Sequence, residues 1–171
     1  ATHTRTSRET NRPSGRTQEI QRLIGRSLRA IVDTKILGER QIFIDCDVIL
    51  ADGGTRCASI TGSYVAMALA IKKMMSKGTL KKSPIISEVA AISVGMLDNT
   101  AILDLCYEED STAEVDMNIL CTGAGKFIEI QRTAEREPFN RDQINEMLEL
   151  AEKGINNLFT IQRYAINGNQ G

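Results

Sequence analysis

Asp52-Gly53-Gly54-Thr55-Arg56 joins two segments of different character. The apolar run before it, Ile42–Leu50, alternates like a β-strand, and the small-residue segment after it, Cys57–Met75, is typical of a helix. Two glycines therefore lie in a turn that leads into a helix, where backbone N–H groups are free and the dipole is positive. Thr55 adds a hydroxyl and Arg56 a planar fork of donors, so the stretch predicts a phosphate-binding turn. A tight strand-to-helix turn with an exposed arginine would explain the same residues.

The composition is that of an ordinary globular protein. The 171 residues suggest one domain, with 42% hydrophobic and 25% charged residues. A net charge of -1 gives no overall basic excess, so any binding of nucleic acid or phosphate must come from local clusters. No apolar run is long enough to span a bilayer and no signal peptide precedes the fold. The sequence therefore predicts a cytoplasmic protein without a membrane partner.

The cysteines and the single histidine offer little chemistry. The cysteines show neither CxxC nor zinc spacing and lie in apolar contexts, which favours reduced core residues over a metal role. They are Cys46, Cys57, Cys106 and Cys121. A Ser/His triad would have to depend on His3, which lies in a polar stretch.

The N-terminal stretch is basic. Residues 1–15 are polar and predict a mobile loop, which is either a plain disordered end or an arm that binds a polyanion through Arg5 and Arg8. The next segment, Thr17–Val32, has helical spacing, with Ser14 as its cap. Arg16 falls in the first turn, where a cation is unfavourable for the helix dipole, so we expect Arg16 to bind a ligand.

Two stripes run along this helix. Its apolar face comprises Ile20, Leu23, Ile24, Leu28 and Ile31. Its polar face carries Arg22, Arg26 and Arg29. The polar stripe fits a solvated face, and Arg22 is in addition a candidate for RNA binding.

The remaining pattern alternates strands and helices. We expect strands over Gln41–Leu50, Val89–Met96, Ile102–Cys106, Ile119–Thr122 and Lys126–Gln131, and helices over Thr55–Lys77 and from Asn140 to about Tyr164. This order predicts an α/β (α+β) chain with a mixed β-sheet, packed with helices, and a right-handed strand–helix–strand crossover. We divide the chain into a basic loop (1–15), a core domain (16–166) and a disordered tail (167–171).

Five carboxylates lie between Glu108 and Asp116. A solvated acidic turn would account for them. Asp116, however, lies in an alternating segment, and an acid within a sheet needs a partner. Asp110 and Asp116 match the one or two carboxylates with which proteins hold Mg²⁺ beside substrate phosphates. The chain has no evident nucleophilic Ser/His or Cys/His set. The phosphate-binding turn, the arginine and the two carboxylates therefore suit phosphoryl transfer in which phosphate itself attacks.

Four separated blocks resemble the ribonuclease PH family over nearly the whole chain. They are residues 14–26, Ile44-Asp45-Cys46-Asp47-Val48, Asp52-Gly53-Gly54-Thr55-Arg56, and residues 107–110 through 115–118. The resemblance implies a ribosomal protein S5 domain 2-like fold and phosphorolysis that trims tRNA precursor 3′ ends, releases nucleoside diphosphates and can run in reverse as nucleotidyl transfer. It also implies a homo-hexamer built as a trimer of dimers, and strands before Ala1 whose loss would leave a sheet edge exposed.

By position, the resemblance assigns roles to particular residues. Arg16 with Gly54, Thr55 and Arg56 would bind inorganic phosphate, the co-substrate. Asp110 and Asp116 would hold Mg²⁺ (or Mn²⁺) or transfer a proton, and Arg5 and Arg8 match arginines of an RNA-facing loop.

Two alternatives stay open. A non-catalytic RNA-binding ring subunit of an exosome-like assembly is expected to have lost Arg56 or an aspartate, which this chain retains. A polynucleotide phosphorylase domain would share fold and chemistry, but the 171 residues hold no second copy and no appended RNA-binding module.

Overall fold

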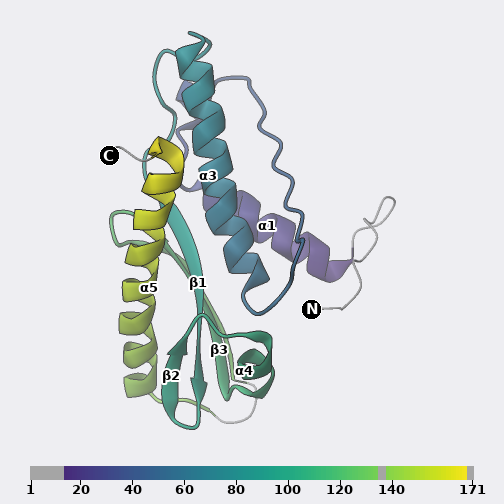
Figure 1. Ribbon diagram of the computed structural model, residues 1–171, viewed down its shortest axis with the longest axis vertical. Coiled ribbons are helices and arrows are strands. Elements are labelled where there is room, and N and C mark those ends of the chain that lie inside the picture. The colour runs from purple at the N-terminus through teal and green to yellow at the C-terminus, as the bar shows by residue number, and fades with distance from the viewer. Residues whose placement is uncertain (1–13, 135–137, 169–171) are drawn as a thin grey trace.

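The computed structural model describes residues 14–134 and 138–168, and Figure 1 shows their arrangement. The elements along the chain are α1 (Gly15–Arg29), α2 (Thr34–Leu37), α3 (Thr55–Ser76), β1 (Val89–Leu97), β2 (Thr100–Leu103), α4 (Tyr107–Thr112), β3 (Val115–Thr122), β4 (Phe127–Ala134) and α5 (Arg141–Asn167).

The strands form one four-stranded sheet in the order β2-β1-β3-β4, with antiparallel pairing throughout. The β1–β2 hairpin turns at Asp98 and Asn99, whose φ angles are 48° and 58°. Positive φ at both central residues matches the twist of the flanking strands, and Asp and Asn tolerate it better than most residues. The register places Ser93, Asn118 and Gln131 in one row across β1, β3 and β4.

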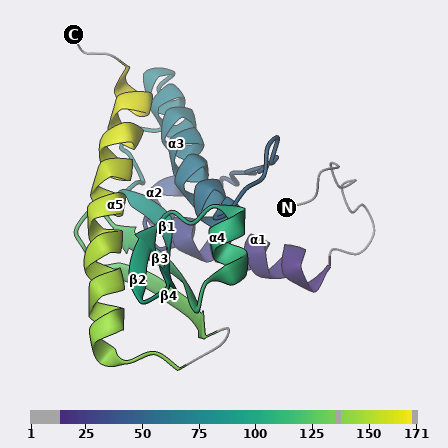
Figure 2. The ribbon, with the colours of Figure 1, turned by 60° about the horizontal axis from the view of Figure 1, so that its bottom comes forward.

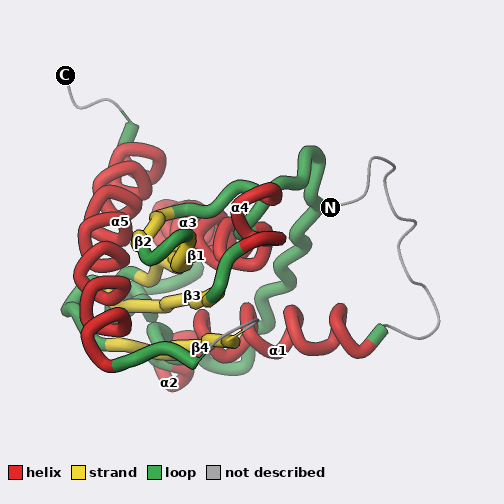
Figure 3. Tube along the Cα trace, turned by 90° about the horizontal axis from the view of Figure 1, so that it is seen from below, coloured by secondary structure: helices red, strands yellow, loops and turns green. Residues whose placement is uncertain are grey.

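The sheet separates two apolar clusters. One cluster joins one face of the sheet to α1 and α3, and the other joins the opposite face to α5. Alternate β1 residues divide between them, with Ala91 in the first cluster and Ile92 in the second. Figure 3 shows α5 along one side of the strands and α1 on the other. The first of these faces carries the candidate site.

The helices confirm the patterns that predicted them. Ser14 caps α1, accepting a hydrogen bond from the Thr17 backbone N–H at 3.2 Å. Asn140 and Gln143 form a capping box at the start of α5. In the described residues, no helix has both the length and the apolarity needed to cross a bilayer.

The strand expected over Gln41–Leu50 is wrong. Residues 41–50 form no strand and run alongside α3 in Figure 1. Phe43 and Ile49 are 90% and 93% exposed, whereas Ile42 and Ile44 pack on the first cluster. An alternating apolar pattern forms a strand only where a neighbouring strand accepts and donates the backbone hydrogen bonds. Within residues 14–134 and 138–168, no strand lies beside residues 41–50 to pair with them. The sheet is therefore antiparallel instead of mixed and the predicted crossover does not form, although the α+β class holds.

Smaller differences concern the acidic segment and the cysteines. Tyr107–Thr112, expected as a loop, is the helix α4, and β2 ends at Leu103, before the predicted Cys106. Cys57 and Cys121 are buried as predicted. Cys46 is exposed because the segment that carries it joins no sheet, and Cys106 is half-buried where it precedes α4.

Candidate phosphate-binding and catalytic site

The turn before α3 leaves the first turn of that helix open. Gly54 is the N-terminal cap in the left-handed conformation, with φ 67°, and as a glycine it has no side chain to cap the helix. The first turn contains no acidic residue. Free N–H groups and the positive end of the dipole therefore make this end of the 22-residue helix suitable for an anion.

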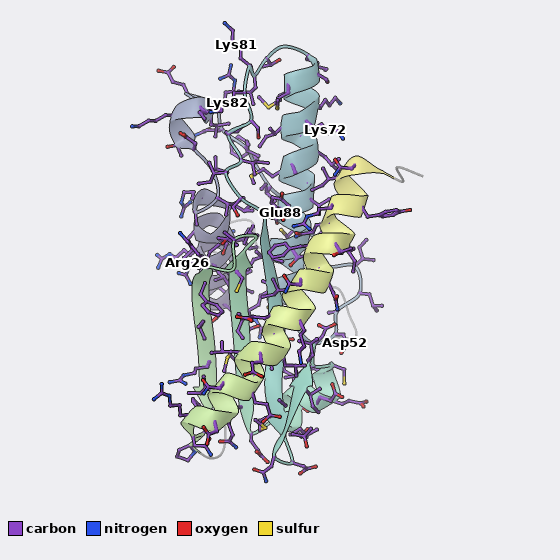
Figure 4. The ribbon with its side chains drawn as sticks, turned by 90° about the vertical axis from the view of Figure 1, so that its left-hand side faces the viewer. Arg26, Asp52, Lys72, Lys81, Lys82 and Glu88 are labelled. Atoms are coloured by element: carbon purple, nitrogen blue, oxygen red, sulfur yellow. The ribbon has the colours of Figure 1, made fainter. Side chains whose placement is uncertain are left out.

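Asp52 fastens the turn to α4. Its Oδ1 accepts hydrogen bonds from the backbone N–H of Tyr107 at 2.6 Å and of Gly53 at 2.9 Å. These two bonds, the one from Tyr107 first, hold the pKa of Asp52 below its ordinary value of 3.8. Figure 4 shows Asp52 beside α4, and in Figure 2 α4 and α5 lie on opposite sides of the strands.

This lowered pKa makes a pH-dependent contribution to stability. A carboxylate that is stabilised in the folded state contributes stability above its unfolded pKa, and the contribution disappears as the pH falls through the folded pKa. We therefore expect Asp52→Asn to lower the thermal midpoint at neutral pH, and the gap from wild type to narrow as the pH falls below the ordinary pKa of 3.8. Thermal unfolding from pH 2.5 to 7 measures this; a gap that does not narrow toward the acid end contradicts the assignment.

Gly53 lies too close to the backbone of the segment before α4 for any side chain. A Cβ built on Gly53 would lie 1.9 Å from the Leu105 carbonyl oxygen, which is a backbone atom. Gly53→Ala is thus expected to reduce the free energy of unfolding by about 1–3 kcal/mol. Gly62→Ala on α3 is the matched control, because its Cβ meets nothing within 4 Å. That control should be neutral or stabilising in the same denaturation measurement, and equal effects of both changes would refute the close approach.

Asn118 connects α3 to Asp116. Its Oδ1 accepts a hydrogen bond from the Cys57 Sγ at 3.0 Å, and its Nδ2 donates to the two Asp116 oxygens at 3.3 and 3.5 Å. Burial raises the pKa of Cys57 to about 12, with Arg56 lowering it and Asp116 and Asp104 raising it further. Cys57 is therefore a neutral thiol that donates to Asn118, and the contacts place Asp116 close to the first turn of α3.

Gln131 connects α3 to α1 on the same face of the sheet. Arg56 Nη1 donates to Gln131 Oε1 at 3.4 Å, and Gln131 Nε2 donates to Glu19 Oε1 at 3.1 Å. Glu19 lies one turn beyond Arg16 on α1. The two helices that carry the candidate arginines thus meet through one side chain of β4.

Arg16, Thr55 and Arg56 line one groove of about 920 Å³ between α1, α3 and residues 42–48. Asp45 and Asp47 line it as well. The structure therefore places three predicted phosphate ligands, up to 40 residues apart in the sequence, on one groove, while Gly54 is not among the residues that line it; their binding of phosphate stays a prediction.

The two predicted metal carboxylates lie on neighbouring elements, outside the residues that line this groove. Asp116 is on β3, opposite Gly95 of β1, and Asp110 is in the first turn of α4. Within the described part of the chain, no three His, Cys, Asp or Glu residues cluster as a metal site. Two partly buried carboxylates nevertheless fit Mg²⁺, a hard cation that proteins hold with one or two carboxylates while phosphate and water supply its other oxygens.

Two further residues at the turn were not predicted. Asp104 Oδ1 lies 3.8 Å, and Ser93 Oγ 3.2 Å, from the position of a Cβ built on Gly54. Ser93 is 3% exposed and its hydroxyl has no partner among the described residues. Asn118 and Gln131 were likewise not singled out as site residues, because only the strand register places them under α3.

The predicted RNA-binding arginines are only partly described. Arg5 and Arg8 lie outside the described residues. Arg22 is exposed on α1, as an RNA contact would require. Arg26, in the same stripe, forms an ion pair with Glu129 at 2.5 Å and tethers α1 to β4 (Figure 4).

Comparison with known proteins identifies the class. Residues 1–73 match domain 1 of the 3′ exoribonuclease family, and residues 87–154 match its domain 2. Ribonuclease PH of Caulobacter vibrioides is 57% identical over 170 residues, which cover 98% of this chain and 71% of that protein. Ribonuclease PH of Bacillus pumilus is 58% identical over 171 residues, covering 98% and 70%. The chain belongs to the ribonuclease PH family.

A solved structure supports the fold. The crystal structure of rice (Oryza sativa) Rrp46 matches with a TM-score of 0.63, over 92% of this chain and 68% of that one. At 13% identity this likeness concerns the fold alone, and it agrees with the α+β class expected from the sequence.

Proposed function

We propose that this chain is a phosphate-dependent 3′→5′ exoribonuclease that trims the 3′ ends of tRNA precursors and other RNAs. The observation that carries the proposal is that Arg16, Thr55 and Arg56 line one groove, beside the N-terminus of α3. An oxygen of inorganic phosphate attacks the phosphorus of the terminal 3′ phosphodiester. The bond to the 3′ oxygen breaks, that oxygen takes a proton, and a nucleoside diphosphate leaves. The reverse reaction adds a nucleotide from its diphosphate.

The residues of the groove bind and orient the attacking phosphate. Arg56 and Arg16 offset its charge, while the N–H groups of the first α3 turn and the Thr55 hydroxyl supply donors. Because phosphoryl transfer depends mainly on positioning and charge stabilisation, such a site needs no covalent nucleophile.

Asp116 is linked to the first turn of α3 through Asn118 and Cys57. Asp110 lies in the first turn of α4, whose start is hydrogen-bonded to Asp52. Asp110 and Asp116 are the residues that would hold Mg²⁺ (or Mn²⁺), which when bound neutralises charge on the phosphoryl oxygens. Asn118, by donating to both oxygens of Asp116, fixes the direction of that carboxylate. We further propose, on the family resemblance, a cytoplasmic homo-hexamer built as a trimer of dimers.

Product analysis tests the proposal. Purified protein is incubated with an RNA bearing a free 3′ hydroxyl, with and without inorganic phosphate, and the released nucleotides are separated. Nucleoside diphosphates that appear only with phosphate support phosphorolysis. Nucleoside monophosphates released without phosphate indicate hydrolysis, and RNA binding without any release indicates a non-catalytic ring subunit.

A further inference from the structure

We propose that Gln131 is a positioning residue that holds the Arg56 guanidinium toward the phosphate groove. This inference rests on the proposed function, because it takes Arg56 to be a phosphate ligand. Gln131 is partly buried on β4 and contacts Arg56 on one side and Glu19 on the other.

The hydrogen bonds set the direction of the Gln131 amide. A carboxylate only accepts hydrogen bonds, so Glu19 requires the donor end of the amide, Nε2, at 3.1 Å. The acceptor end, Oε1, is then left facing Arg56, whose guanidinium only donates. Arg56 donates to Gln131 and Gln131 donates to Glu19, so the two hydrogen bonds run in series. Glu19 of α1 thereby sets the orientation of Arg56 on α3.

A neutral partner preserves the charge that phosphate needs. An arginine side chain loses rotamer entropy when it is held in one place, so a partner that holds it in advance favours binding. A carboxylate could hold Arg56 equally well, but it would neutralise the cation. The Gln131 amide provides an acceptor without a charge, so the full positive charge of Arg56 remains available to the anion.

The strand position makes this support rigid. Gln131 pairs with Asn118 across β3 and β4, and Asn118 pairs with Ser93 across β1 and β3. Each residue of this row meets one residue of the turn or first turn of α3, with Gln131 at Arg56, Asn118 at Cys57 and Ser93 near Gly54. Residues held by a sheet keep a binding side chain in place better than loop residues do.

Two substitutions separate positioning from packing. Gln131→Leu removes the acceptor at similar volume and is expected to weaken phosphate binding about tenfold, leaving kcat at saturating phosphate within about twofold. Gln131→Glu keeps an acceptor for Arg56 but neutralises its charge and loses the donor to Glu19, and is expected to weaken phosphate binding at least as much. A purely structural role predicts instead that Gln131→Leu, which keeps the volume of the side chain, leaves phosphate affinity at the wild-type value.

The readout is binding of inorganic phosphate, measured by the phosphate-dependent rise in thermal midpoint and by the KM for phosphate in diphosphate release. Glu129→Gln is the matched control. Glu129 lies two residues from Gln131 on β4 and also tethers α1, through Arg26, but it does not contact Arg56 in the described residues. Phosphate affinity should stay within about twofold of wild type in this variant.

The outcomes distinguish this inference from the proposed function. Unchanged phosphate affinity in Gln131→Leu, or an equal loss in Glu129→Gln, overturns the role of Gln131. A wild-type protein that binds phosphate but releases no nucleoside diphosphate refutes phosphorolysis and leaves the binding test of Gln131 intact. A wild-type protein that shows no phosphate-dependent stabilisation refutes both.

Discussion

Arg56→Ala is expected to lower kcat/KM for phosphate at least about 100-fold, which corresponds to about 3 kcal/mol of lost transition-state stabilisation. Arg56 is partly buried at the first turn of α3 and lines the groove with Arg16. Removing it deletes a charged donor fork and leaves the helix end to bind the anion with backbone groups. The kcat/KM of Arg56→Lys for phosphate should lie between those of wild type and Arg56→Ala, because lysine keeps the positive charge but lacks the planar fork of donors.

Initial rates of diphosphate release at varied phosphate concentration, with RNA saturating, measure this effect. Arg163→Ala is the control for loss of one positive charge, because Arg163 lies on α5 and pairs with Glu88. Rates in that variant should match wild type. If the KM for phosphate stayed unchanged in Arg56→Ala, the turn before α3 would not be the phosphate site.

Local signals explain which elements the sequence predicted correctly. The caps at Ser14 and Asn140 and the glycine turn before Thr55 act within a few residues of the helices they start. For that reason α1, α3 and α5 follow from spacing and capping alone. The candidate turn could be recognised for the same reason.

Contacts between distant segments explain the rest. Residues 41–50 alternate like a strand, but pairing depends on a partner that periodicity does not reveal. Asn118 and Gln131 become neighbours of Cys57 and Arg56 only through the strand register. The helix α4 did carry a local signal, since three acids occupy its first turn, where they favour the dipole.

The positions of Asp110 and Asp116 follow from the same two kinds of information. The bond from Tyr107 to Asp52 brings the start of α4, and so the segment of Asp110, to the turn before α3. Pairing of β3 with β1 and β4 places Asp116 on the face that α3 covers. Short-range spacing identified the two acids, and long-range contacts place Asp116 near the first turn of α3 and the start of α4 near the turn before it.

Asp116→Asn is expected to lower kcat by about 10²- to 10⁴-fold while phosphate binding persists. The substitution keeps the shape and still offers Asn118 an acceptor oxygen, so β3 and the first turn of α3 should keep their contacts. What it removes is the negative charge that either holds a divalent cation or moves a proton. The phosphate-dependent rise in thermal midpoint should therefore match wild type, because the groove is lined by other residues.

Single-turnover release of nucleoside diphosphate at saturating phosphate and varied Mg²⁺ separates the two roles of Asp116. Recovery of the rate at high Mg²⁺ indicates that the carboxylate holds the cation, whereas a loss that no Mg²⁺ concentration restores indicates proton transfer. Glu152→Gln, an exposed acid of α5 on the opposite side of the sheet, controls for the change in charge and should retain full activity. Wild-type rates in Asp116→Asn, with an unchanged Mg²⁺ requirement, would remove Asp116 from the chemistry and leave Asp110 to account for it.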